Sequence, residues 1–207
     1  MNLDASPTEA ITIEAARLVV DEGMEYGAAK RRAARDFGRR GRQPELPSNE
    51  ALEDEVRAHI GLFCADTQPA ELQALREVAL LWMQRLAEFR PHLSGAVWRG
   101  TATRLSAVHV DLYCDDPKAA EIMLVNAGVN YDVGSIDRPG SEPLCVLTVG
   151  SRTAGLRDLV SVHLHLHDFD DQRGALKPDA RGRPWRGDTP AVLRLLAPGS
   201  ATTGSAA

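Results

Sequence analysis

Three histidines alternate with leucines in the segment Val162–His167, which reads Val-His-Leu-His-Leu-His. Alternate side chains of a β-strand point to the same face, so we expect His163, His165 and His167 on one face and the leucines on the core side. Imidazole is a common ligand of zinc and other borderline metals. The face is therefore either a metal site or a polar, solvent-exposed surface of a half-buried strand.

A second predicted strand carries a histidine and an aspartate at the same spacing. Residues 106–112 read Ser-Ala-Val-His-Val-Asp-Leu, so His109 and Asp111 share one face. If the two strands are neighbours, Asp111 lies about 5 Å from the histidines across the ladder. A divalent transition metal bound by Asp111, His163 and His165 is then the candidate cofactor, and zinc, nickel or copper suits this ligand set better than magnesium.

The region that contains this second strand resembles the core of the nucleotidyltransferase superfamily, over roughly residues 93–150. Val97–Thr101 followed by Ser106–Leu112 gives a strand, a turn of small residues and a strand with alternating polar residues. In that family the turn binds a triphosphate. Two carboxylates at i and i+2 on the second strand, and a third on a neighbouring strand, bind two magnesium ions.

The resemblance implies roles for five residues of this chain. Gly100, Thr101 and Ser106 take the place of the nucleotide-binding turn. Asp111 and His109 take the place of the catalytic residues.

The carboxylate motif of the family is incomplete here. In one register Asp111 is the first carboxylate, but Tyr113 stands where the second belongs. In the other register Ala107 and His109 replace both carboxylates. The leading interpretation is a divergent nucleotidyltransferase-like protein that binds a nucleotide or a partner and lacks two-magnesium transfer. An active nucleotidyltransferase with a non-standard metal site is one alternative.

A basic segment at residues 30–42 supports a second alternative, a nucleic-acid-binding or regulatory module. It holds seven cations opposed only by Asp36, in a chain whose formal net charge is −5. With Ala15–Val19 it is similar to the first two helices of tetracycline-repressor-type DNA-binding domains, but Arg39–Pro47 reads as a loop where the recognition helix belongs. A solvated helix face is the other interpretation. The candidate nucleic-acid contacts are Lys30, Arg31, Arg32 and Arg35.

The elements that must position these residues predict an α+β fold. We expect a helical N-terminal half over residues 1–90, then a mixed β-sheet with flanking helices and a nucleotidyltransferase-like core over 93–196, and a disordered tail over 197–207. Strands are predicted at 96–98, 107–114, 129–133, 144–149 and 159–167. Helices are predicted at 7–23, 26–37, 48–64, 69–90 and 115–127, and from Asp188 onward.

The helix predicted over residues 69–90 carries one continuous apolar stripe. Such a stripe packs either inside the chain or against a second copy in a homodimer. Its members are Leu72, Leu75, Ala79, Trp82, Leu86 and Phe89.

The remaining features favour a cytoplasmic protein. The three cysteines are far apart and form no C-x-x-C, which favours a reducing compartment over a disulfide framework. The N-terminus does not read as a signal peptide, and no apolar run approaches the 18 residues of a membrane span. P-loop, dinucleotide-binding and nucleophile-elbow motifs are missing, which argues against an ATP-dependent ligase of ordinary design.

Overall fold

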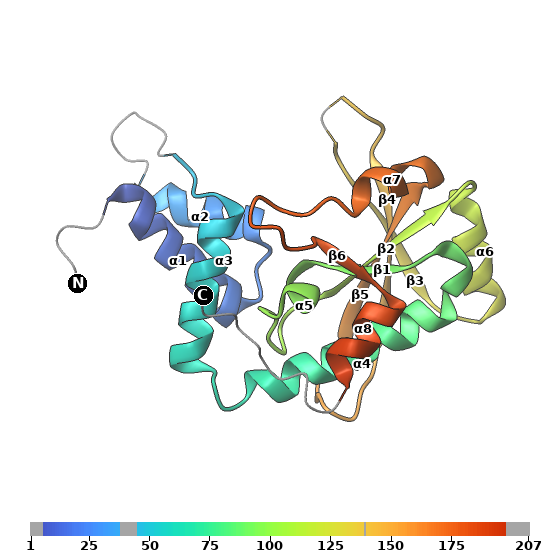
Figure 1. Ribbon diagram of the computed structural model, residues 1–207, viewed down its shortest axis with the longest axis horizontal. Coiled ribbons are helices and arrows are strands. Elements are labelled where there is room, and N and C mark those ends of the chain that lie inside the picture. The colour runs from blue at the N-terminus through green and yellow to red at the C-terminus, as the bar shows by residue number, and fades with distance from the viewer. Residues whose placement is uncertain (1–5, 38–44, 139, 198–207) are drawn as a thin grey trace. The chain divides into compact units, whose positions relative to one another are not determined.

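The computed structural model describes residues 6–37, 45–138 and 140–197 (Figure 1). In these residues the protein is α+β, with eight α-helices and a six-stranded mixed sheet. The contacts divide the chain into two units, Met1–Pro69 with Thr101–Ser106, and Ala70–Gly100 with Ala107–Ala207. The predicted boundary near residue 91 thus falls inside unit 2.

Unit 1 is built from three helices, α1 (Pro7–Glu22), α2 (Tyr26–Phe37) and α3 (Asn49–Phe63). Each lies where the sequence predicts it. The predicted capping box at the start of α1 is confirmed, because the Ser6 side chain accepts from the Glu9 amide at 3.2 Å and the Glu9 carboxylate accepts from the Ser6 amide at 2.8 Å. The predicted loop before α3 and the tail lie mostly outside the described residues.

The sheet of unit 2 has the strand order β3-β4-β5-β2-β1-β6. Strands β2 and β5 run parallel, and the other neighbouring pairs are antiparallel. The bounds are β1 His92–Ser94, β2 Val108–Cys114, β3 Tyr131–Ile136, β4 Leu144–Ser151, β5 Val160–Asp168 and β6 Arg186–Asp188. The four longer strands confirm the sequence-based predictions, although β3 begins two residues later than expected.

The strand predicted at residues 96–98 is wrong, because these residues lie in the short helix α5 (Gly95–Arg99). Gly95 and Gly100 bracket this helix with φ angles of 67° and 78°, in the left-handed region that glycine adopts without strain. Three residues are too few for alternation to distinguish a strand from a helical turn. The same limit explains why β1 and β6, of three residues each, were not predicted.

Further helices follow, and apart from Gln68 and Pro69 of α4 they belong to unit 2. They are α4 (Gln68–Arg85), α6 (Pro117–Asn126), α7 (Gln172–Ala175) and α8 (Thr189–Leu196), with 3₁₀ turns at Ala87–Phe89 and Phe169–Asp171. The apolar stripe along α4 and the turn after it is buried except at Leu72, as the intramolecular alternative predicts. None of the helices in the described ranges is long and apolar enough to cross a membrane.

The two faces of the sheet differ in composition. The leucine face of β5 is buried as predicted, since Leu164 and Leu166 pair in register with Val110 and Leu112 of β2. The opposite face carries the histidines and Asp111. Apolar burial on one face therefore fixes the register that aligns the polar side chains on the other.

Gly187 in β6 allows the indole ring of Trp98 to lie directly on the strand. A Cβ atom at position 187 would lie 2.2 Å from the Trp98 ring. That ring is held by its Nε1, which donates to the Pro184 carbonyl at 2.9 Å, so making room would break this hydrogen bond.

We therefore expect Gly187→Ala to lower the free energy of unfolding of unit 2 by about 1–3 kcal/mol. Urea unfolding followed by tryptophan fluorescence measures the change, because all three tryptophans lie in unit 2. Gly134→Ala is the matched control, since its Cβ would meet nothing closer than 3.9 Å. Equal midpoints for the two variants would contradict this packing.

Candidate functional site

Five of the six histidines of the chain lie in strands of unit 2, and the sixth, His59, is in α3. The parallel pair β2–β5 places His109 beside His163, Asp111 beside His165 and Tyr113 beside His167. Strand β1 continues the rows, because His92 pairs with Asp111 and Ser94 with His109. Paired residues of adjacent strands share a face, so these side chains form one polar surface, here called the histidine face.

The histidine face is largely buried. His165 is 9% exposed, Asp111 and His92 are each 5% exposed, and Tyr113 is 2% exposed. The interpretation of a solvent-exposed strand surface is therefore wrong for His165, whereas His163 and His167 are of intermediate exposure. A buried polar face is costly unless its groups are hydrogen-bonded to one another.

The imidazoles of β2 and β5 are bonded within the sheet. His109 Nδ1 and His165 Nε2 lie 3.0 Å apart, so one ring donates to the other. His163 Nδ1 lies 2.9 Å from the Thr148 hydroxyl on β4, which is the next strand in the sheet. Each of these contacts occupies one of the two nitrogens of the ring.

Asp111 is the central charged group of the face. Its Oδ1 accepts a hydrogen bond from His167 Nε2 at 2.8 Å, and its Oδ2 lies 3.6 Å from Arg186 Nη1. Burial opposes ionisation of this carboxyl group, but the hydrogen bond from His167 and the charge of Arg186 outweigh burial and lower its pKa. Asp111 is thus a carboxylate neutralised by protein groups.

Tyr113 connects Arg186 to His167. Arg186 Nη1 donates to the Tyr113 hydroxyl, and the phenol ring stacks on the His167 ring with centroids 5.2 Å apart. Burial raises the pKa of Tyr113, so its hydroxyl stays protonated at neutral pH. On its other side, His167 Nδ1 lies 4.0 Å from the carboxylate of Asp171.

The loop that precedes Arg186 is hydrogen-bonded to Asp179, whose side chain is fully buried. Its carboxylate accepts from the backbone amides of Arg181 and Arg183 at 2.9 and 2.8 Å, and from the Arg99 guanidinium at 3.0 Å. Pro178 and Pro184 form an isolated bridge that closes this loop. The loop is therefore pinned to α5 immediately before β6 begins.

Metal binding by Asp111, His163 and His165 stays a prediction. Among the residues that the structure describes, no group of three or more histidine, cysteine, aspartate or glutamate side chains is arranged to hold a metal ion. Asp111, His163 and His165 do lie on one face, but each is hydrogen-bonded to a different partner. The shared face was predictable from alternation, and the separate partners were not.

The three residues of the predicted nucleotide-binding turn have local contacts. Gly100 ends α5, the buried Thr101 hydroxyl lies 3.5 Å from the Tyr26 hydroxyl, and the Ser106 hydroxyl accepts from the Thr103 amide at 3.1 Å. Gly100 belongs to unit 2, whereas Thr101 and Ser106 belong to unit 1. Nucleotide binding by this turn stays a prediction.

Half of the described basic segment is held within unit 1. Lys30 donates to the Asn49 side chain at 2.8 Å, and Arg32 is paired with Glu22 at 2.6 Å. The later arginines of the segment lie outside the described residues, and nucleic-acid binding stays a prediction. The other two candidate contacts are exposed: Arg31 and Arg35.

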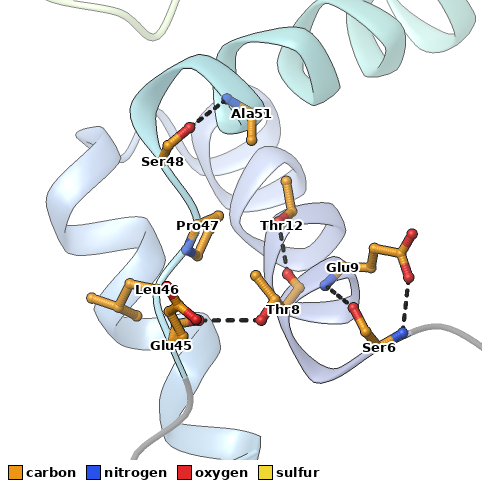
Figure 2. A pocket seen from close by; sticks show the side chains of 9 residues that line it. All are labelled: Ser6, Thr8, Glu9, Thr12, Glu45, Leu46, Pro47, Ser48 and Ala51. Atoms are coloured by element: carbon orange, nitrogen blue, oxygen red, sulfur yellow. Dashed lines mark hydrogen bonds between the residues drawn. The ribbon is translucent and has the colours of Figure 1, made fainter.

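A hollow in unit 1 lies between the start of α1 and the chain that enters α3 (Figure 2). Its polar side chains serve helix ends, since Ser6 and Glu9 form the capping box and Ser48 accepts from the Ala51 amide at 3.0 Å. Thr12 donates to the Thr8 carbonyl within α1. The polar side chains of this hollow are therefore engaged at the helix ends and within α1.

Sequence reasoning missed four members of the site, namely His92, Tyr113, Thr148 and Arg186. An arginine that follows a turn rich in proline and glycine, at 178–187, was the one local signal for Arg186. The others become neighbours only through strand pairing.

A comparison with protein-family models finds no match for this chain, and no curated protein matches it. What the protein does is therefore inferred from its site.

Burial of His165 makes unit 2 sensitive to acid. Burial and the neighbouring histidines lower the pKa of His165 to about 4, although Asp111 acts in the opposite direction. An unfolded histidine takes up its proton near pH 6.5, so between about pH 6.5 and pH 4 the unfolded chain binds more protons than the folded one. Stability then falls as the pH falls through this window, by roughly 3 kcal/mol.

We expect His165→Gln to remove most of this pH dependence, because glutamine does not titrate. Urea midpoints measured by tryptophan fluorescence from pH 7 down to pH 4 test the prediction. His59→Gln, in unit 1, is the control and should retain the wild-type dependence. Parallel pH profiles for wild type and His165→Gln would rule out a depressed pKa at His165.

Proposed function

We propose that this chain is a divergent nucleotidyltransferase-like protein that binds a nucleotide on the histidine face and lacks two-magnesium transfer. The observation that carries the proposal is the set of partners around Asp111. This residue is the one carboxylate of β2, it is bonded to His167, and its neighbour on β5 is His165 rather than a second carboxylate.

These partners disfavour magnesium for two physical reasons. Magnesium requires oxygen ligands in near-octahedral geometry, and imidazole nitrogens suit it poorly. In addition, the Arg186 guanidinium lies 3.6 Å from Asp111 Oδ2, where it would repel a divalent cation. The family's two-metal chemistry therefore does not fit the residues present.

The same partners favour a phosphate-bearing ligand. Arginine donates charge-assisted hydrogen bonds to phosphate oxygens, and a neutral imidazole N–H can donate to them as well; the face presents both residue types. The mixed sheet supports a nucleotidyltransferase-like core. Its strand β2, which carries Asp111, runs parallel to β5, which carries the three histidines. Binding without transfer is the function that these features support best.

We expect no magnesium-dependent transfer of label from nucleoside triphosphates to the protein or to RNA. Equilibrium binding of the same triphosphates should be measurable by isothermal titration calorimetry. Asp111→Asn tests the central residue, and Asp132→Asn on the exposed surface of β3 is the matched control. Robust transfer by the wild type and Asp132→Asn that is lost in Asp111→Asn would contradict the proposal and indicate an enzyme.

A further inference from the structure

The guanidinium group of Arg186 lies beside Asp111 but does not donate a hydrogen bond to it. The guanidinium group has five N–H donors. Within the described part of the chain, the one hydrogen bond of the Arg186 side chain goes to the Tyr113 hydroxyl. Its Nε is buried without a hydrogen-bond partner, and the side chain as a whole is 23% exposed. Most of its donors therefore have no hydrogen-bond partner among the described residues.

The carboxylate of Asp111 also has an oxygen that accepts no hydrogen bond. Its Oδ2 has no hydrogen-bond partner, and its side chain is 7% exposed. The 3.6 Å separation from Arg186 Nη1 balances the two charges without forming a hydrogen bond. A buried charged pair with unbonded groups on both sides is costly in a free protein, and the unbonded donors of Arg186 are the groups that an anion can satisfy.

The backbone that carries Arg186 is rigidly supported. Strand β6 pairs with β1, where Arg186 lies opposite Ser94. The preceding loop is tied down by Asp179, and Trp98 packs on Gly187 from the other side. An arginine on such a support needs little reorganisation to bind an anion.

We propose that Arg186 is the phosphate-binding group of the histidine face and supplies the positive charge that magnesium supplies in two-metal nucleotidyltransferases. In the free protein the guanidinium neutralises Asp111. With ligand, its remaining donors bind a phosphate, for which the planar fork of arginine is well matched. This inference rests on the proposed nucleotide binding and specifies its ligand as metal-free nucleoside triphosphate.

The effect of magnesium on nucleotide affinity distinguishes this site from a two-magnesium site. Magnesium neutralises part of the triphosphate charge that Arg186 recognises. Chelation of magnesium should therefore leave affinity unchanged or increase it, whereas a two-magnesium site loses affinity when the metal is removed.

Calorimetric titration with ATP and GTP, in excess EDTA and in excess magnesium, tests the inference. We expect wild type to bind at least as tightly in EDTA. Arg186→Met should weaken binding at least about tenfold, because a charge-assisted contact is lost. Arg186→Lys, which keeps the charge and loses the fork, should fall between them. Arg194→Met, at an exposed position of α8, is the matched control and should bind like wild type.

A second variant guards against misfolding. Arg186→Met leaves Asp111 without its cation, whereas the double variant Asp111→Asn/Arg186→Met removes both charges and should fold while still binding weakly. Binding that requires magnesium and is unchanged in Arg186→Met and Arg186→Lys would overturn the role of Arg186 and leave nucleotide binding intact. Failure of ATP and GTP to bind wild type under either condition would overturn the proposed function as well.

Discussion

The buried carboxylate of Asp111 is the constraint on which the histidine face depends. A carboxylate that is 5% exposed must be compensated, and removing one partner of a buried charged pair costs about 3–5 kcal/mol. Here a hydrogen bond from His167 and the nearby guanidinium of Arg186 provide that compensation. Tyr113 contacts both partners, because Arg186 donates to its hydroxyl and its ring stacks on His167.

Strand topology brings the partners to Asp111. The parallel alignment of β2 with β5 places His167 two residues beyond His165, the partner of Asp111, on the same face and close enough to bond Asp111. Arg186 arrives from β6, two strands away, at the end of a loop that Asp179 holds in shape. A site made this way depends on packing remote from its ligand, because Trp98 and Asp179 fix the strand that carries the arginine.

Periodicity in the sequence predicts which side chains of one strand share a face. It does not predict which residues of other strands lie beside them. Alternation over seven to nine residues in β2 and β5 correctly predicts which side chains share a face. It does not say whether that face is covered, so the buried His165 was interpreted as solvent-exposed or metal-bound. His92 and Arg186 lie in three-residue strands, which are too short to show a pattern, and Asp111, His163 and His165 acquire separate partners only in three dimensions.

The central claim is that protein groups rather than a divalent metal neutralise Asp111. Paramagnetic broadening by Mn²⁺, a substitute for magnesium, measures this directly through the histidine side-chain resonances in two-dimensional ¹H–¹⁵N spectra. If protein groups neutralise Asp111, Mn²⁺ added to the protein produces no saturable broadening of the His165 and His167 signals. Saturable broadening of both signals that disappears in Asp111→Asn would contradict it and establish a metal site at this carboxylate.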